Sequence, residues 1–129
     1  MTAEFKKVWM LKIYTGEDVI VGDEPLYRTI LDEARRLKIA GATVIKGIEG
    51  YATEVRGIDR RPVSLFTGVS NLPVLVTIVD ERESLEKIFP FLEKKAYHAL
   101  VLFEESTVLV TDYMRQVAAK KLMAQEDEE

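Results

Sequence analysis

The sequence contains no cysteine and a single histidine, His98. The absence of cysteine excludes disulfide bonds, thiolate catalysis and zinc sites built from cysteine. A transition-metal site would depend on carboxylates almost alone, and carboxylates are poor ligands for such metals. We therefore assign no metal site, and we expect His98 to have a structural role.

Other absences narrow the class of protein. No apolar run reaches the roughly 18 residues of a membrane-spanning helix, and the N-terminal stretch lacks the cleavage site of a signal peptide. A net charge of −4 argues against nucleic-acid binding, which needs a positive surface. We therefore expect a cytoplasmic protein without nucleic-acid binding and without direct membrane insertion.

Asparagine occurs once and glutamine twice, whereas glutamate, lysine and arginine are plentiful. Few thermolabile residues and many charges are typical of proteins from thermophiles. The sequence also lacks the G-x-S-x-G, H-E-x-x-H and P-loop lysine patterns. No catalytic residue is assigned, and the protein is not predicted to be an enzyme.

Apolar periodicity predicts the secondary structure. We expect helices over 23–38, 82–95 and 113–124, and strands over 6–15, 42–50, 72–80 and 99–112, with a further short strand over 63–66. The order β-α-β-β-α-β predicts an α+β, ferredoxin-like fold with an antiparallel sheet and two helices on one face. Residues 1–112 would form this domain, and residues 113–129 a C-terminal helix followed by an acidic, disordered tail.

Local signals refine these boundaries. Asp23 is a candidate N-cap for the first helix, with Pro25 in its first turn. Asp80 and Glu83 have the spacing of a capping box, and Pro90 should kink the second helix. We expect a bend or bulge in the last strand near residues 104–106.

Three predicted strands, 6–15, 72–80 and 99–112, are apolar on both faces. Two helices cover only one face of a sheet, whereas an exposed face normally alternates with polar residues. The second face therefore needs another cover, and we expect a homo-oligomer that forms through it.

The stretch GATVIKGIEGY, residues 41–51, places three glycines in and beside a predicted strand. Glycine weakens a strand unless a bulge, a bend or a close backbone approach requires it. The following stretch RGIDRR has three arginines against one aspartate, a net charge of +2. Free backbone amides with arginines suit a phosphate group, although a solvated surface loop has the same composition.

Three patterns in this order carry a family resemblance: I-Y-x-G-E at 13–17, G-A-T-V-x-x-G-I-x-G at 41–50 and L-P-V-x-x-x-I-V-D at 72–80. Over about residues 6–112 the chain resembles a widespread family of small uncharacterised bacterial and archaeal proteins, usually grouped with the PII-like signalling proteins. The resemblance implies a ferredoxin-like homotrimer.

The chain is more distantly similar to true PII proteins, which bind adenine nucleotides between subunits near the base of a long loop. This similarity implies a ligand site formed by Thr43, Gly50, Tyr51, Arg56, Arg60 and Arg61. Ala52 replaces the second glycine of the PII pattern, and KKAYHA at 94–99 replaces its Gly-Asp-Gly-Lys loop. These departures favour AMP or ADP over ATP as the ligand.

Three functions remain open from the sequence. The first is a regulatory homotrimer that binds AMP or ADP and engages a protein partner, such as a membrane transporter, through its 52–62 loop. The second is a small oligomeric enzyme that acts on an anionic metabolite in the same cleft. The third is a CutA-like trimer with a metal-tolerance or structural role.

Overall fold

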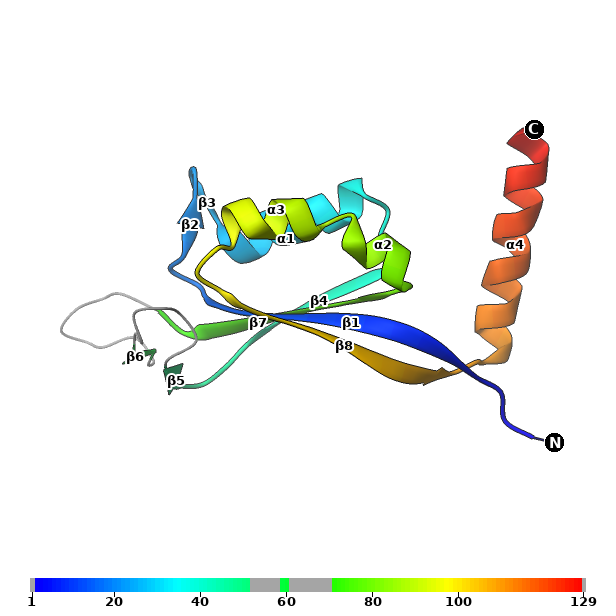
Figure 1. The fold of residues 1–129 in the computed structure, drawn as a ribbon, viewed down its shortest axis with the longest axis horizontal. Helices are drawn as coiled ribbons and strands as arrows, with labels where there is room; N and C mark the ends of the chain where they lie inside the picture. The colour runs from blue at the N-terminus through cyan, green and yellow to red at the C-terminus, as the bar shows by residue number, and fades with distance from the viewer. Residues whose placement is uncertain (1, 52–58, 61–70, 129) are drawn as a thin grey trace.

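The computed structural model describes residues 2–51, 59–60 and 71–128 (Figure 1). Four strands form one antiparallel sheet in the order β4-β7-β1-β8. The strands are β1 (Phe5–Gly16), β4 (Gly41–Lys46), β7 (Pro73–Asp80) and β8 (Leu100–Leu109). Helices α1 (Leu26–Arg36), α2 (Arg82–Glu86) and α3 (Phe89–Lys95) lie along one face of it. The predicted ferredoxin-like fold is confirmed.

The hydrophobic core lies between the sheet and these helices. The central strand β1 pairs with both β7 and β8, so that Leu11 stands opposite Ile78 on one side and Phe103 on the other. Side chains alternate across a strand, and every second residue of β1 and β7 therefore faces the helices. The buried core consists of Leu11, Ile13, Leu26, Ile30, Ala34, Val74, Val76, Ile78, Leu85, Ile88, Leu92 and Ala96.

The opposite face of the sheet, which we call the open face, carries apolar side chains, and none of the described helices covers it (Figure 1). One row across it consists of Ile45, Leu75, Tyr14 and Leu100, and the next consists of Thr43, Thr77, Lys12 and Leu102. Ile45 is 55% exposed, Leu100 48% and Leu102 39%. The Lys12 ammonium lies 2.6 Å from the Glu104 carboxylate on the same face. The open face is therefore partly apolar, as we expected of a sheet face that another subunit covers.

The first helix begins later than predicted, because a short hairpin precedes it. Strands β2 (Ile20–Val21) and β3 (Glu24–Pro25) pair around a two-residue turn. Gly22 occupies this turn at φ 65°, a conformation that glycine adopts readily. Asp23 therefore lies in the turn rather than at the N-cap, and Pro25 is the N-cap, with an extended backbone.

The second predicted helix is divided into α2 and α3, which meet at Lys87 and Ile88. Pro90, the second residue of α3, has no N–H to donate to a carbonyl one turn earlier. The capping-box prediction is wrong, because Glu81 is the N-cap and has no side-chain cap. Instead Asp80 accepts hydrogen bonds from the backbone N–H groups of Ala40 and Glu81. The carboxylate thus joins the start of β4 to the end of β7.

The C-terminal region also differs from the expectation. Strand β8 pairs with β1 in an unbroken register from Leu100 to Leu109, so there is no bulge near residues 104–106. Helix α4 (Asp112–Glu128) runs beyond the predicted end at residue 124. Figure 1 shows α4 standing away from the two layers, at the end of the molecule where the N-terminus lies. The predicted strand 63–66 lies outside the described residues.

Candidate functional site

The three sequence patterns that carry the family resemblance meet at one end of the sheet. The I-Y-x-G-E pattern ends β1, and the L-P-V pattern begins β7 beside it, because these strands are antiparallel neighbours. Next to them a two-residue ladder pairs β5 (Gly50–Tyr51) with β6 (Asp59–Arg60). We call this region, where residues 16–18, 46–51, 59–60 and 71–73 lie together, the loop base (Figure 1).

Glu17 connects two strands at the loop base. Its backbone N–H donates to the Leu72 carbonyl at 3.0 Å, and its carboxylate accepts a hydrogen bond from the Leu72 N–H at 3.0 Å. The second carboxylate oxygen lies 3.1 Å from the Lys46 ammonium. The Leu72 hydrogen bond, together with Lys46, lowers the pKa of Glu17. Glu17 therefore stays ionised and holds the ends of β1, β4 and β7 together.

Gly47 explains part of the glycine-rich stretch. Its N–H donates to the Pro73 carbonyl at 2.7 Å, and a Cβ at this position would lie 2.9 Å from Cγ of the proline ring. A larger residue would push the two segments apart. Strand β4 accordingly ends at Lys46, four residues before the predicted end, and the chain turns across Pro73. A Cβ on Gly41 would meet open space.

Arg60 is the most buried polar residue of the loop base, with 1% of its surface exposed. Its guanidinium donates to the Asp18 carboxylate and, at 3.1 Å, to the Asn71 carbonyl. The same guanidinium packs against Gly16 so closely that a Cβ there would collide with it. The Asn71 side chain in turn donates to the Asp59 carbonyl at 2.9 Å. Arg60 thus has a carboxylate partner in the place where we predicted a ligand phosphate.

The other predicted site residues are placed differently. Gly50 pairs with Arg60, and Tyr51 pairs with Asp59, so these residues belong to the loop base. The Tyr51 side chain is 73% exposed. Thr43 lies apart from them in β4, on the open face opposite Thr77. The positions of Arg56 and Arg61 are not among those that the structure describes.

Sequence reasoning missed most of the residues that surround Arg60. Gly16 and Glu17 belong to the I-Y-x-G-E pattern, which we used only for the resemblance. Asp18 follows that pattern directly, and Asn71 directly precedes L-P-V. The polar residues Asp18 and Asn71 beside these patterns were the one available signal. That signal does not indicate which arginine they contact.

The loop base contains two ion pairs, one at Lys46 and one at Arg60. Glu17 raises the pKa of Lys46, whose ammonium also lies 5.9 Å from the centre of the Tyr27 ring. Asp18 balances Arg60. Two exposed side chains with apolar surface lie in the same region: Ile48 is 84% exposed and Tyr51 is 73% exposed. The surface therefore offers an aromatic ring and backbone groups next to satisfied ion pairs.

Among the described residues, no group of three or more histidine, aspartate or glutamate side chains is placed to hold a metal ion. Of the helices that the structure describes, none has the length and apolar character needed to cross a membrane.

Comparison with known proteins shows the family. The family model of DUF190, described as Uncharacterized ACR, COG1993, matches residues 8–108. A UPF0166 protein of Aquifex aeolicus is 32% identical over 100 residues, which cover 78% of this chain and 91% of that protein. A UPF0166 protein of Methanocaldococcus jannaschii is 35% identical over 106 residues, which cover 82% and 89%.

Solved structures show the same fold at low identity. A Thermus thermophilus protein provisionally assigned to PII-like signaling is 15% identical with a TM-score of 0.54, covering 84% of this chain and 93% of that one. The apo form of CPII, a nitrogen regulatory PII-like protein from Thiomonas intermedia, is 14% identical with a TM-score of 0.51, covering 85% and 100%. A further CPII structure, bound to ADP, AMP and bicarbonate, is 15% identical with a TM-score of 0.51, covering 83% and 91%. The sequence relatives and the extent of the family match together show that this chain belongs to the DUF190 (UPF0166) family, and its fold is PII-like.

Proposed function

We propose that this protein is a cytoplasmic PII-like regulatory protein that binds an adenine nucleotide, AMP or ADP, in clefts between the subunits of a homotrimer. The observation that supports the proposal best is the convergence at the loop base. Three separate sequence patterns meet there, beside an exposed tyrosine and at both ends of the 52–58 and 61–70 segments.

The open face supports the homotrimer. Ile45, Leu100 and Leu102 expose apolar surface in neighbouring rows of one sheet. Large exposed apolar patches mark interaction sites, and a second copy of the same sheet offers a matching surface. Thr43 lies in these rows, so a subunit packed here would bring it to the interface.

The nucleotide is supported by the fold and by the chemistry of the loop base. The CPII protein, which has this fold, was crystallised with ADP, AMP and bicarbonate. In our proposal the Tyr51 ring packs on the base or ribose, and the Gly50 backbone approaches the ligand. Arg56 and Arg61 contact its phosphates. Arg60, which is buried against Asp18, positions the loop instead of contacting the ligand.

Ligand binding would fix the 52–62 loop in one conformation, and that conformation would then engage or release a protein partner such as a membrane transporter. Charged ligands that order a neighbouring segment are a common switching device. The loop base suits this role, because the β5–β6 ladder and the Arg60–Asp18 pair hold residues near both ends of this loop.

Thermal unfolding with AMP, ADP, ATP and cyclic AMP tests the proposal. A ligand that binds only the folded protein raises its stability by about 2.7 kcal/mol at 100 times its dissociation constant. We expect AMP and ADP to raise the melting temperature. Tyr51→Ala should reduce this shift, whereas the control Tyr113→Ala should not, because Tyr113 is equally exposed but lies on α4 at the far end of the molecule. Equal shifts in both variants would contradict a site at the loop base.

A further inference from the structure

Strand β8 is an edge of the sheet, and none of the described strands pairs with its outer side. Such an edge leaves backbone N–H and C=O groups free to pair with another chain, and proteins usually guard it with lysine, proline or a bulge. Residues 100–103 of β8 are Leu-Val-Leu-Phe, and the strand pairs with β1 without a bulge. This part of the edge therefore carries none of these guards.

The hydrogen bonds between β1 and β8 show which backbone groups are free. The Val110 N–H donates to the Glu4 carbonyl at 2.8 Å, so these two residues form a hydrogen-bonded pair. Such pairs alternate along an antiparallel ladder with pairs that make no bonds to each other. In the unbroken register the even-numbered residues of β8 therefore bond to β1, and the odd-numbered residues present their backbone groups to the outer edge. Val101 and Phe103 are the first two of these.

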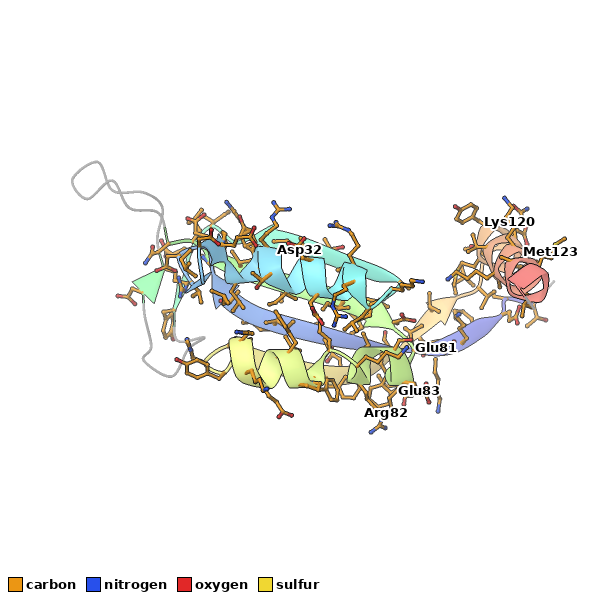
Figure 2. The ribbon with its side chains drawn as sticks, turned by 90° about the horizontal axis from the view of Figure 1, so that it is seen from above. Asp32, Glu81, Arg82, Glu83, Lys120 and Met123 are labelled. Carbon is orange, nitrogen blue, oxygen red and sulfur yellow. The ribbon has the colours of Figure 1, made fainter. Side chains whose placement is uncertain are left out.

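An apolar groove lies beside the same two residues. It has a volume of about 480 Å³ and lies between α3 and β8 on the helix side of the sheet. Figure 2 shows α3 at the margin of the helix layer, with no further described helix beyond it. Glu93 and Tyr97 are the polar residues of its lining, and Val101 and Phe103 belong to its apolar part. The residues with free backbone groups are thus residues whose side chains line the groove.

A second copy of this chain does not offer side chains that fit this groove. If such a copy continued the sheet with its helices on the same side, its edge strand would be β4 or β8. Val44 of β4 packs on its own core, as do Val101 and Phe103 of β8. An extended segment that has no helix of its own keeps the side chains of one face free. We therefore look for the occupant in such a segment.

The charge of the groove adds a preference. Glu93 is exposed and is not part of an ion pair within the described part of the chain. The rings of Phe89, Tyr97 and Phe103 belong to the same lining. A carboxylate next to aromatic faces favours a cationic group, through an ion pair or a cation–π contact. The occupant is therefore apolar on one face and carries a basic residue.

We propose that the outer edge of β8 binds an extended segment of a partner protein, which joins the sheet as a further strand antiparallel to β8. The backbone of the segment pairs with Val101 and Phe103, and its apolar side chains, at every second position, enter the groove. In this mode of recognition the main-chain hydrogen bonds give affinity and the pockets for alternate side chains give specificity. The site uses no residue of the loop base and does not depend on nucleotide binding.

Fluorescence polarisation of the full chain with the labelled peptide Lys-Val-Thr-Val-Thr-Val-Thr tests the proposal. When the valines enter the groove, their N–H groups face β8 and those of the threonines face away. N-methylation of the valines removes the donors to β8, whereas N-methylation of the threonines alters the same number of amides on the outer side. We expect the first peptide to bind at least about tenfold more weakly than the second. Equal affinities of the two, or no binding of the unmethylated peptide, would overturn the proposal.

Two substitutions on one face of β8 locate the peptide. Val101→Asp places a charge in the groove and should weaken binding, whereas the control Thr107→Asp places the same charge beyond the groove and should not. Circular dichroism should show that both variants are folded. Equal affinities of the two folded variants would contradict the groove. In sedimentation velocity, a fall in the mass of the wild-type assembly on addition of the peptide would show that a second copy occupies the edge, and would overturn the choice of a partner protein.

Discussion

The Arg60 guanidinium, 1% exposed, forms an ion pair with the Asp18 carboxylate, 42 positions away in the sequence. The pair fixes the second strand of the β5–β6 ladder against the end of β1. It also explains Gly16, because the guanidinium occupies the space of a Cβ. The Arg60 guanidinium is buried and does not reach solvent, so we expect it to position the loop and not to contact a ligand. The two roles can be told apart by measurement.

Removal of Asp18 should destabilise the protein. Asp18→Ala leaves a buried guanidinium without its carboxylate, and a hydrogen bond to a charged group contributes about 1.5–3 kcal/mol. Urea denaturation should show a loss of this size. The exposed Arg82–Glu86 pair, with a spacing of four residues on one helix, is the matched control. Glu86→Ala should cost less than about 0.5 kcal/mol, and similar losses in the two variants would contradict the role of Asp18.

Substitutions of Gly16 and Gly41 test whether the structure requires glycine at a position for lack of space. Gly16→Ala places a methyl group in the position of the Arg60 guanidinium, and we expect a loss of about 1–3 kcal/mol, as for other overpacked sites. Gly41→Ala meets open space and should be neutral, or stabilising by up to about 1 kcal/mol. Chemical denaturation measures both. A Gly16 variant as stable as wild type would show that Arg60 has another position available.

The lowered pKa of Glu17 predicts a pH dependence of stability with a definite sign. The folded carboxyl titrates below its ordinary value of 4.5, because the folded protein favours the ionised form. The stabilisation is therefore complete above the unfolded pKa and is lost as the pH falls through the folded one. The melting temperature of wild type should exceed that of Glu17→Gln at neutral pH, and the difference should shrink on acidification. A difference that stays constant down to about pH 3 would contradict this prediction.

The end of α1 offers a stabilising substitution. Lys38 has φ 59°, a left-handed conformation that costs about 1–2 kcal/mol for a residue with a side chain. Its N–H donates to Arg35 and the N–H of Ile39 donates to Ala34, the two hydrogen bonds of a helix-ending motif that favours glycine. Lys38→Gly should raise the stability by up to about 1 kcal/mol, since part of the gain is offset by chain entropy. Arg35→Gly, inside the same helix, should lower it by about 1 kcal/mol. Urea denaturation of the two variants measures both changes, and a loss of stability in Lys38→Gly would contradict the prediction.

The main elements could be predicted because their patterns are local. Residues such as Leu11, Ile13, Val76 and Ile78 recur at strand spacing, and the four sheet strands were found within a few residues of their ends. The end of α4 was missed because acidity was read as disorder, although glutamate and glutamine are good helix formers. Asp23 was misassigned because a hairpin turn and a helix start favour the same residues.

The loop base could be predicted only in part. The glycines and arginines showed where it lies, but the partner of Arg60 depends on how the chain returns from residue 60 to the end of β1. A contact between residues 18 and 60 leaves no periodic signal in one sequence. The glycine-rich stretch suggested free backbone amides for a phosphate, whereas the Gly47 N–H donates to the Pro73 carbonyl and the residue packs against the Pro73 ring.

The central claim is that an adenine nucleotide binds between subunits beside Tyr51. Isothermal titration of the wild-type protein with ADP and with AMP, at two temperatures to avoid a vanishing enthalpy, tests it most directly. We predict saturable binding of one nucleotide per subunit, weakened at least tenfold by Tyr51→Ala. The absence of heat for both nucleotides at both temperatures would contradict the proposed function.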